Sequence, residues 1–291
     1  MQAQAEIGAL KLALPKGRMQ EGVLRLFKDA GIEVHSDGRG YRPRISLPHF
    51  EAKLLKPQNV IEMLHHGSRD VGFAGRDWVL ELEADLVEIL DTGLDPVRLV
   101  AAAPPGILDH GRLPERSLVV ASEYERLSRE WIKRRELHAT FVRSYGATEV
   151  FPPEDADCIV DNTASGATLA ENDLVVVDEL MTSSTRLFAH PRALESPTKK
   201  KSIDDLSLLL ASVLEARRRV MVEVNVPGNR LEAVIAVLPC MHQPTVSPLH
   251  AGQGYAIKAA VPRDLLPTVI PRIKLCGGRD IVVSALTQIV P

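Results

Sequence analysis

The stretch that decides the fold of this chain reads Cys158-Ile-Val-Asp-Asn-Thr-Ala-Ser-Gly-Ala-Thr-Leu169. The apolar run Cys158–Val160 predicts a buried strand, and Leu169–Asn172 predicts the start of a helix. Between them, small hydroxylated residues and one glycine direct several backbone N–H groups and hydroxyls toward one point. A helix N-terminus carries unpaired donors and partial positive charge, so this turn is suited to bind a phosphate.

Two carboxylates, Asp157 and Asp161, lie just before this turn. They can bind Mg²⁺ or the hydroxyls of a sugar attached to the phosphate, which together indicates a sugar phosphate. An alternative is that the turn only caps its own helix, with Thr163 or Ser165 as N-cap. Neither Gly-x-x-x-x-Gly-Lys-Ser/Thr nor Gly-x-Gly-x-x-Gly occurs, so the common glycine-rich nucleotide loops are excluded.

Strands and helices alternate along the first 216 residues. A strand over Leu10–Leu14 precedes a helix ending near Gly31, and later strands are expected over Asp70–Ala74, Val97–Ala103, Ser117–Ala121, Leu174–Asp178 and Ser184–Ala189. This alternation predicts an open α/β sheet with parallel strands. After Arg217–Arg219 the pattern becomes strand, helix, strand, strand, helix and strand, which is typical of a ferredoxin-like unit.

Composition excludes several classes of protein. A net charge of −3 gives no general attraction to nucleic acid or anionic lipid, and no apolar run reaches the roughly 20 residues of a membrane span. Met1 to Leu10 lacks the pattern of a secretory signal. The three cysteines are distant from one another and odd in number, so they predict neither a disulfide framework nor a metal site. We therefore expect a cytoplasmic protein with no nucleic-acid or membrane partner.

Three turns follow predicted strands and can face one cleft. They are Pro15–Arg18, Ala74–Asp77 and Thr163–Thr168. Open α/β sheets bind ligands at the carboxyl ends of their strands. Any one of the basic turns alone would be read as a solvated surface charge. Together, two arginines, a lysine and a phosphate-binding turn predict a highly anionic substrate.

Over nearly its full length, the chain resembles the long form of the ATP phosphoribosyltransferase family. The resemblance is carried by motifs that occur in the family's order: Leu14-Pro-Lys-Gly-Arg18, Asp70-Val-Gly-Phe-Ala-Gly-Arg-Asp-Trp78, Ala156-Asp-Cys-Ile-Val-Asp-Asn-Thr-Ala-Ser-Gly-Ala-Thr-Leu169, Ser183-Ser-Thr-Arg-Leu187, Leu238-Pro239 and Pro244-Thr-Val-Ser-Pro-Leu249.

The resemblance implies transfer of the 5-phosphoribosyl group of phosphoribosyl pyrophosphate (PRPP) to N1 of ATP. This reaction gives N1-(5-phospho-β-D-ribosyl)-ATP and pyrophosphate, with Mg²⁺ as cofactor, and is the first step of histidine biosynthesis. The implied fold is α/β: a bilobal, periplasmic-binding-protein-like catalytic core with a C-terminal ferredoxin-like or ACT-like regulatory domain. Residues 1–97 with 181–216 would form lobe I, residues 98–180 lobe II, and residues 217–291 the regulatory domain.

The matching positions imply a role for each residue of the cleft. The catalytic residues would be Lys16, Arg18 and Arg76, and nucleotide would be bound by Gly17, Gly75 and Asp77. PRPP would be bound by Glu149, Asp161, Thr163, Ala164, Ser165, Gly166, Ala167 and Thr168. Asp161, with Glu149, would contact Mg²⁺ that is largely held by substrate. Two segments depart from the family: Lys56–Asn59, and the polar pair Asn162-Thr163 in place of two aliphatic residues.

The tail resembles a module that binds L-histidine as a feedback inhibitor, with Thr245, Ser247 and Leu249 at the site. Together the tail and the long form imply a homo-oligomer, dimer to hexamer, without a separate regulatory subunit. Three alternatives remain: a solute-binding or effector domain of the same architecture, a type I phosphoribosyltransferase for nucleobases, and an amino-acid sensor with decayed lobes. Asp161 followed by Asn162 weakens the second, because that class opens its loop with two acidic residues.

Overall fold

A computed structural model describes residues 8–35 and 40–290, so most of the segment Met1 to Leu10 lies outside the described residues. Within these ranges the chain divides into two compact units. The first is drawn from Met1–Arg25 and Ile32–Asp204, and the second from Leu26–Gly31 and Asp205–Pro291. No helix in the described ranges is both long and apolar enough to cross a membrane.

The first unit is built on an eight-stranded sheet with the order β4-β1-β5-β10-β6-β9-β7-β8. Its strands are β4 (Phe50–Leu55), β1 (Leu10–Pro15), β5 (Val71–Gly75), β10 (Val175–Ala189), β6 (Val87–Ala103), β9 (Cys158–Thr163), β7 (Leu118–Ser122) and β8 (Ala139–Arg143). A separate hairpin pairs β2 (Val34–His35) with β3 (Arg44–Ile45). The alternation of strands and helices thus produces the expected α/β sheet.

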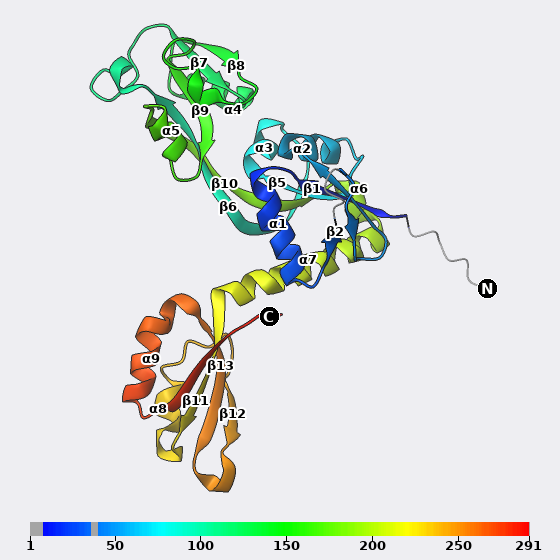
Figure 1. Ribbon diagram of the computed structural model, residues 1–291, viewed down its shortest axis with the longest axis vertical. Coiled ribbons are helices and arrows are strands. Elements are labelled where there is room, and N and C mark those ends of the chain that lie inside the picture. The colour runs from blue at the N-terminus through cyan, green and yellow to red at the C-terminus, as the bar shows by residue number, and fades with distance from the viewer. Residues whose placement is uncertain (1–7, 36–39, 291) are drawn as a thin grey trace, which may run out of the picture. The chain divides into compact units, whose positions relative to one another are not determined.

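Two long strands, β6 and β10, run antiparallel to each other and connect the two halves of this sheet (Figure 1). The prediction of parallel strands is correct within each half, where β1 pairs with β4 and β5, and β7 with β8 and β9. It is wrong at the centre of the sheet. The prediction of two strands over Leu174–Asp178 and Ser184–Ala189 is also wrong, because β10 is continuous. The backbone groups of β10 form hydrogen bonds with β6, through several register shifts, along its whole length. They do so also across the polar stretch between the two predicted strands, so the strand is not interrupted there.

Helices follow the strands of the first unit. They are α1 (Arg18–Asp29), α2 (Pro57–His65), α3 (Arg76–Glu81), α4 (Glu125–Arg134), α5 (Ala167–Glu171) and α6 (Pro191–Glu195), and α7 (Pro197–Arg218) continues into the second unit. Short 3-10 turns lie at Pro105–Ile107 and Thr148–Val150. The hydrophobic core includes Trp131 of α4 and Tyr124, which are the largest fully buried side chains. Helix α4 is therefore held firmly against the sheet beside the site described below.

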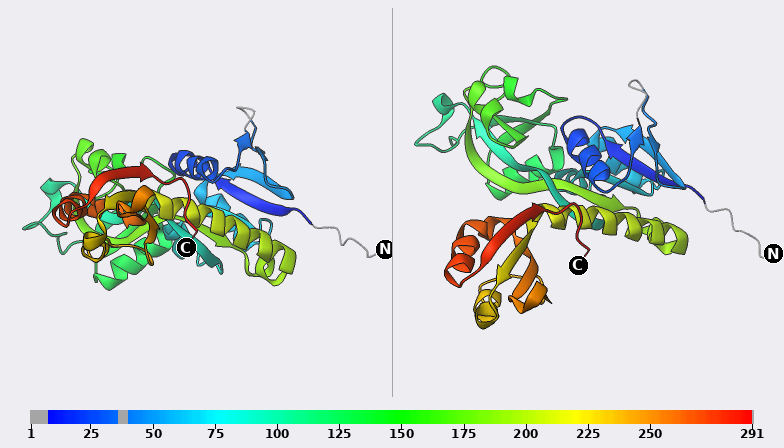
Figure 2. Two further views of the ribbon diagram at one scale, coloured as in Figure 1. Left: turned by 90° about the horizontal axis from the view of Figure 1, so that it is seen from below. Right: turned by 60° about the horizontal axis from the view of Figure 1, so that its bottom comes forward.

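The second unit contains a four-stranded antiparallel sheet with the order β12-β13-β11-β14. Its elements are β11 (Arg219–Val226), α8 (Leu231–Ile235), β12 (Thr245–Pro248), β13 (Tyr255–Pro262), α9 (Leu266–Leu275) and β14 (Arg279–Ala285), with 3-10 turns at Gly228–Arg230, His250–Gly252 and Arg263–Leu265. Four alternate valines of β11, at 220, 222, 224 and 226, are buried with Val234 of α8 and Ile273 of α9. Both helices thus cover one face of the sheet, and the predicted ferredoxin-like arrangement is confirmed (Figure 1 and Figure 2).

Candidate functional site

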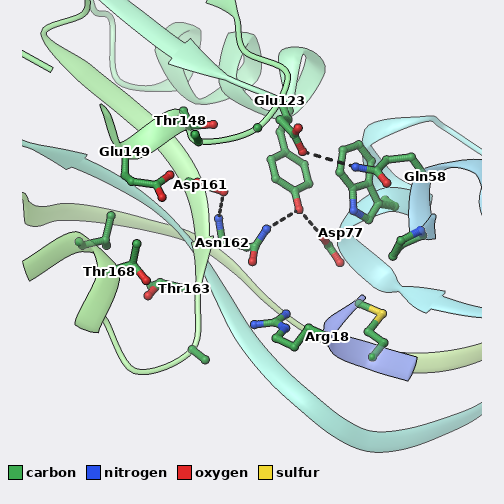
Figure 3. A pocket seen from close by; sticks show the side chains of 18 of the residues that line it. Arg18, Gln58, Asp77, Glu123, Thr148, Glu149, Asp161, Asn162, Thr163 and Thr168 are labelled. Atoms are coloured by element: carbon green, nitrogen blue, oxygen red, sulfur yellow. Dashed lines mark hydrogen bonds between the residues drawn. The ribbon is translucent and has the colours of Figure 1, made fainter. Parts of the chain in front are cut away.

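A cavity of about 610 Å³ lies in the first unit at the ends of several strands (Figure 3). Its walls come from the turn after β1, the start of α3, the segment after β7, and the turn after β9. Its size is within the range of small-molecule sites, which is about 300–1,000 Å³. The turns that follow the strand ends, which we expected to face one cleft, thus line one shared cavity.

The turn after β1, here called the basic turn (Pro15–Arg18), presents two cations to this cavity. Gly17 has φ +81°, a left-handed conformation that favours glycine, and it reverses the chain before α1 begins at Arg18. The Arg18 side chain is exposed and lines the cavity. Lys16 also lines it, and its Nζ lies 4.0 Å from the centre of the Tyr41 ring, in a cation–π contact. Both cations are therefore available to an anionic ligand.

The turn after β9, here called the phosphate loop (Thr163–Thr168), is partly folded by its own side chains. Thr163 Oγ1 accepts the N–H of Gly166 at 3.0 Å, and Ser165 Oγ accepts the N–H of Ala167 at 3.3 Å. Gly166 has φ +84° and precedes α5, a helix of five residues. The self-capping alternative is thus observed in part. It leaves the loop open to a ligand, because Ala164, Ser165, Ala167 and Thr168 are exposed and line the cavity.

Carboxylates make one side of the cavity acidic. Asp161 is mostly buried, and burial raises its pKa from the ordinary value of 3.8 to about 6, with further repulsion from Glu149 and Glu123. Its Oδ1 accepts the N–H of Asn162 at 2.7 Å, which opposes that rise in pKa. Among residues 8–35 and 40–290, no group of three or more His, Cys, Asp or Glu side chains is arranged to hold a metal ion. Any cation bound here would therefore need ligands from a substrate as well.

Asp157, the second carboxylate before the loop, does not line the cavity. Its carboxylate accepts hydrogen bonds from Arg116 at 2.7 Å and from the N–H of Val119 at 2.8 Å. These contacts hold the start of β9 against the start of β7. Asp157 therefore supports the sheet.

Four polar side chains, Ser183, Asp77, Tyr124 and Asn162, form a continuous set of hydrogen bonds that we call the cleft network. Figure 3 shows its part from Asp77 to Asn162. Ser183 Oγ donates to Asp77 Oδ1 at 2.6 Å, and the Tyr124 hydroxyl donates to Asp77 Oδ2 at 2.7 Å. Asn162 Nδ2 donates to the Tyr124 oxygen at 3.0 Å. Burial, and next the charge of Asp77, raise the pKa of Tyr124 well above its ordinary value, so this hydroxyl stays protonated.

The ring of Tyr124 is stacked on Trp78, with centroids 4.5 Å apart and planes at 27°. A second polar contact lies nearby, where Gln58 Nε2 donates to Glu123 at 3.4 Å. Gln58 lies in α2, which follows β4, and Trp78 lies in α3, which follows β5, whereas Glu123 and Tyr124 follow β7. These contacts therefore join the two halves of the sheet across the cavity.

Most of the predicted site residues meet at this cavity. Those that line it are Lys16, Arg18, Asp77, Glu149, Asp161, Thr163, Ala164, Ser165, Ala167 and Thr168. The remaining predicted residues, Gly17, Gly75, Arg76 and Gly166, belong to the same turns but do not line it, and Arg76 is exposed. Residues that sequence reasoning missed include Gln58, Glu123, Tyr124, Thr148 and Asn162. The end of the predicted strand Ser117–Ala121 was a signal for two of them, because Glu123 and Tyr124 follow it directly.

The second unit has a smaller cavity of about 360 Å³. It is lined by Asn225, Val226, Pro227, Leu249, His250, Gln253, Arg279 and Asp280. Leu249 is thus the predicted histidine-site residue that this cavity contains, whereas Thr245 and Ser247 lie on β12, whose residues are exposed. A cation and an anion, Arg279 and Asp280, both belong to the lining, and Asp280 Oδ2 accepts a hydrogen bond from Asn225 Nδ2 at 3.0 Å.

Comparisons with known proteins give a consistent result. A family model described as ATP phosphoribosyltransferase matches residues 56–212, and one described as HisG, C-terminal domain, matches residues 216–288. The chain is 35% identical over 287 residues to an ATP phosphoribosyltransferase from Pelotomaculum thermopropionicum, covering 97% of this chain and 99% of the relative. A relative of the same description from Desulforudis audaxviator is 35% identical over 290 residues, with the same coverage of 97% and 99%. Among solved structures, the ATP phosphoribosyl transferase (HisG:HisZ) complex from Thermotoga maritima has a TM-score of 0.63 at 28% identity, covering 71% of this chain and 98% of that chain.

Proposed function

Because the chain belongs to the ATP phosphoribosyltransferase family, whose enzymes use ATP and PRPP in the first step of histidine biosynthesis, we propose that the 610 Å³ cavity is where it performs this transfer. The observation that carries the proposal is that one cavity contains both the basic turn and the phosphate loop. Their separation along the chain is more than a hundred residues. A ligand with anionic groups at two ends, such as PRPP, can bind both.

The phosphate loop would bind the 5′-phosphate of PRPP. Five of its six residues line the cavity, and loops of this type bind phosphate through backbone N–H groups and hydroxyls. Lys16 and Arg18, on the opposite wall, would bind the pyrophosphate that departs. Arg18 presents a planar fork suited to two phosphate oxygens, and Lys16 supplies a compact charge. Arg76, Gly17, Gly75 and Asp77 remain predicted catalytic or nucleotide-binding positions on neighbouring turns.

The carboxylates on the acidic side of the cavity, Asp161, Glu149 and Glu123, are suited to bind a divalent cation. Carboxylate oxygens are suitable ligands for Mg²⁺. Burial, and next repulsion from Glu149 and Glu123, raise the pKa of Asp161, and a bound cation would offset both by favouring the carboxylate. Asp161 and Glu149 would hold the ion together with oxygens of PRPP, because they are too few to hold it alone. When bound, Mg²⁺ would neutralise charge on the departing pyrophosphate.

The reaction requires positioning more than covalent chemistry from the protein. The anomeric carbon gains positive character as the bond to pyrophosphate breaks, and N1 of the adenine then attacks it. Asp161, which is ionised above pH about 6, would stabilise that positive character. Lys16 and Arg18 would stabilise the leaving group, and the cavity walls would align the two substrates.

The second unit would regulate this activity. A free amino acid needs a cation for its carboxylate and an anion for its ammonium group, and Arg279 and Asp280 offer both in the 360 Å³ cavity. Leu249 would complete a site for L-histidine as feedback inhibitor, and Thr245 and Ser247, on the strand that precedes it, remain predicted positions outside this cavity. Histidine must bind the less active state more tightly in order to inhibit.

In the proposed domain organisation, residues 1–97 and 181–216 form lobe I, residues 98–180 form lobe II, and residues 217–291 form the regulatory domain. The presence of a C-terminal domain in the same chain supports a homo-oligomer, dimer to hexamer, that needs no separate regulatory subunit.

The test is a pyrophosphate-release assay with ATP, PRPP and Mg²⁺, with and without millimolar L-histidine. Turnover that depends on both substrates and is suppressed by histidine would support the transferase and its regulation. Turnover without suppression would reject the histidine site only. A folded protein without turnover would reject the transferase and favour a binding function for the same cavity.

A further inference from the structure

The polar pair Asn162-Thr163, which departs from the family pattern, has a defined partner for each side chain. Asn162 donates to the Tyr124 hydroxyl at 3.0 Å, and Thr163 accepts from Gly166 at 3.0 Å within the phosphate loop. Both side chains line the cavity, and Thr163 is 7% exposed. Asn162, directly before the phosphate loop, is thus held by Tyr124, and Thr163, the first residue of the loop, is held by Gly166.

The Tyr124 hydroxyl has one donor and one acceptor, and both of its hydrogen bonds are made inside the protein. Tyr124 is 0% exposed and Asp77 is 3% exposed, so water does not compete for these bonds. Asp77 in turn uses both carboxylate oxygens, since Ser183, 5% exposed, donates to the second. A buried hydroxyl–carboxylate hydrogen bond is among the stronger ones, and breaking it would leave a charged group unpaired.

The cleft network joins strand ends on opposite sides of the cavity. Asp77 follows β5, which is the parallel neighbour of β1, and the basic turn follows β1. Tyr124 follows β7, which is the parallel neighbour of β9, and the phosphate loop follows β9. The bond between Tyr124 and Asp77 therefore bridges the two turns that the proposed function assigns to the two ends of PRPP.

We propose that the cleft network holds the phosphate loop at a set distance from the basic turn, and that Tyr124 and Asn162 are therefore positioning residues for phosphoribosyl transfer. The inference rests on the proposed function. Neither side chain needs to touch the reacting atoms, because its effect passes through the backbone of the loop that follows Asn162. Misplacement of a bound group by about 1 Å can reduce a rate by about a hundredfold, so such a device would affect catalysis measurably.

The test uses Tyr124→Phe, Asn162→Leu and the double variant in the full-length chain. Tyr124→Phe removes the hydroxyl and keeps the ring that stacks on Trp78. We expect each single variant to reduce kcat/KM for PRPP by about tenfold to a hundredfold, with KM for PRPP rising more than KM for ATP. The double variant should resemble Tyr124→Phe alone, because Asn162 acts through the hydroxyl that this change removes.

A control separates positioning from loss of stability. Trp131 Nε1 donates to Asp178 at 2.7 Å, the same length as the Tyr124–Asp77 bond, but it does not line the cavity. Trp131→Phe should lower the Tm and leave kcat/KM for PRPP unchanged. Unchanged kcat/KM in both cleft variants, or effects that add independently in the double variant, would overturn the inference while wild-type turnover still supported the transferase. Absence of wild-type turnover would overturn the proposed function and the inference with it.

Discussion

Replacing Asp161 by asparagine should stabilise the substrate-free protein, and this gain should depend on pH. Burial raises the pKa of Asp161 from 3.8 to about 6, so ionising it costs more free energy in the folded chain than in the unfolded chain. Between pH about 4 and 6 the folded chain keeps a proton that the unfolded chain has released. The free energy of unfolding therefore falls as the pH rises through this window.

The pKa values determine the size of this effect. A difference between 3.8 and about 6 corresponds to at most about 3 kcal/mol, present in full above pH 6 and nearly absent below pH 4. The side-chain amide of the variant would retain an oxygen to accept the N–H that Asp161 Oδ1 accepts in the wild type. For a unit of this size, about 3 kcal/mol corresponds to a rise in Tm of about 6–12 °C.

The assay is thermal unfolding of wild type and Asp161→Asn at pH 4 and pH 8, without ligands. We expect the variant to unfold about 6–12 °C higher at pH 8 and within about 2 °C of wild type at pH 4. Asp155→Asn is the matched control, because Asp155 is exposed in the same part of the chain and should show no such dependence. A Tm difference that is the same at both pH values would refute the reasoning, whereas loss of turnover in the variant is expected because Asp161 is part of the proposed site.

Three further changes give distinct outcomes. Arg18→Ala should reduce kcat/KM for PRPP by about a hundredfold or more, since it removes a cation from the leaving-group side, while the Tm stays within about 2 °C because the side chain is exposed. Asp178→Asn should cost about 1 kcal/mol of stability at pH 7, because its half-exposed partner Arg135 is screened by solvent. Hydrogen bonds from its arginine partner, then its tryptophan partner, lower the pKa of Asp178 to about 2, so this deficit should shrink as the pH falls from about 4 toward 2 in urea unfolding. Gly75→Ala should lower both Tm and kcat/KM, because an added Cβ would lie 2.0 Å from Asp77 Oδ1 and displace the carboxylate that Tyr124 binds.

Two of these changes, Arg18→Ala and Gly75→Ala, have a matched control on the same chain. Arg25→Ala alters an exposed arginine of the same helix as Arg18 and should leave kcat/KM unchanged. Gly106→Ala places a Cβ where nothing lies within 4 Å, so it should be tolerated. A tolerated Gly75→Ala, or an Asp178→Asn deficit that persists at low pH, would contradict the geometry from which these expectations are drawn.

Local patterns in the sequence predicted the turns of the site well. When an apolar run is followed by Lys-Gly-Arg, or by a run of small hydroxylated residues, these neighbouring residues alone show where the strand ends and that the turn can bind an anion. Ten of the fourteen residues predicted for the cleft line the cavity: Lys16, Arg18, Asp77, Glu149, Asp161, Thr163, Ala164, Ser165, Ala167 and Thr168. The resemblance to a family supplied the reaction, because turns of this composition also occur in binding proteins.

Other features could not be predicted from neighbouring residues. Strand β10 is continuous across a polar stretch because β6 pairs with it, and that partner lies about ninety residues away in the chain. The Asp77–Tyr124 bond joins residues 47 positions apart, and each of them lies at the start of a different helix. Patterning detects which side chains are buried, but it does not detect which distant polar groups they meet.

The sequence by itself determined most of the elements, the ferredoxin-like tail and the phosphate-binding composition of the turn after Val160, because propensity, periodicity and turn chemistry act over a few residues. The tertiary structure alone decided that Asp77 would be a buried acceptor for two hydroxyls, one from β10 and one from the segment after β7. It also decided that Asp161 would carry a raised pKa. Both properties depend on exclusion of water by segments that are remote in sequence, and only the packed chain brings those segments together.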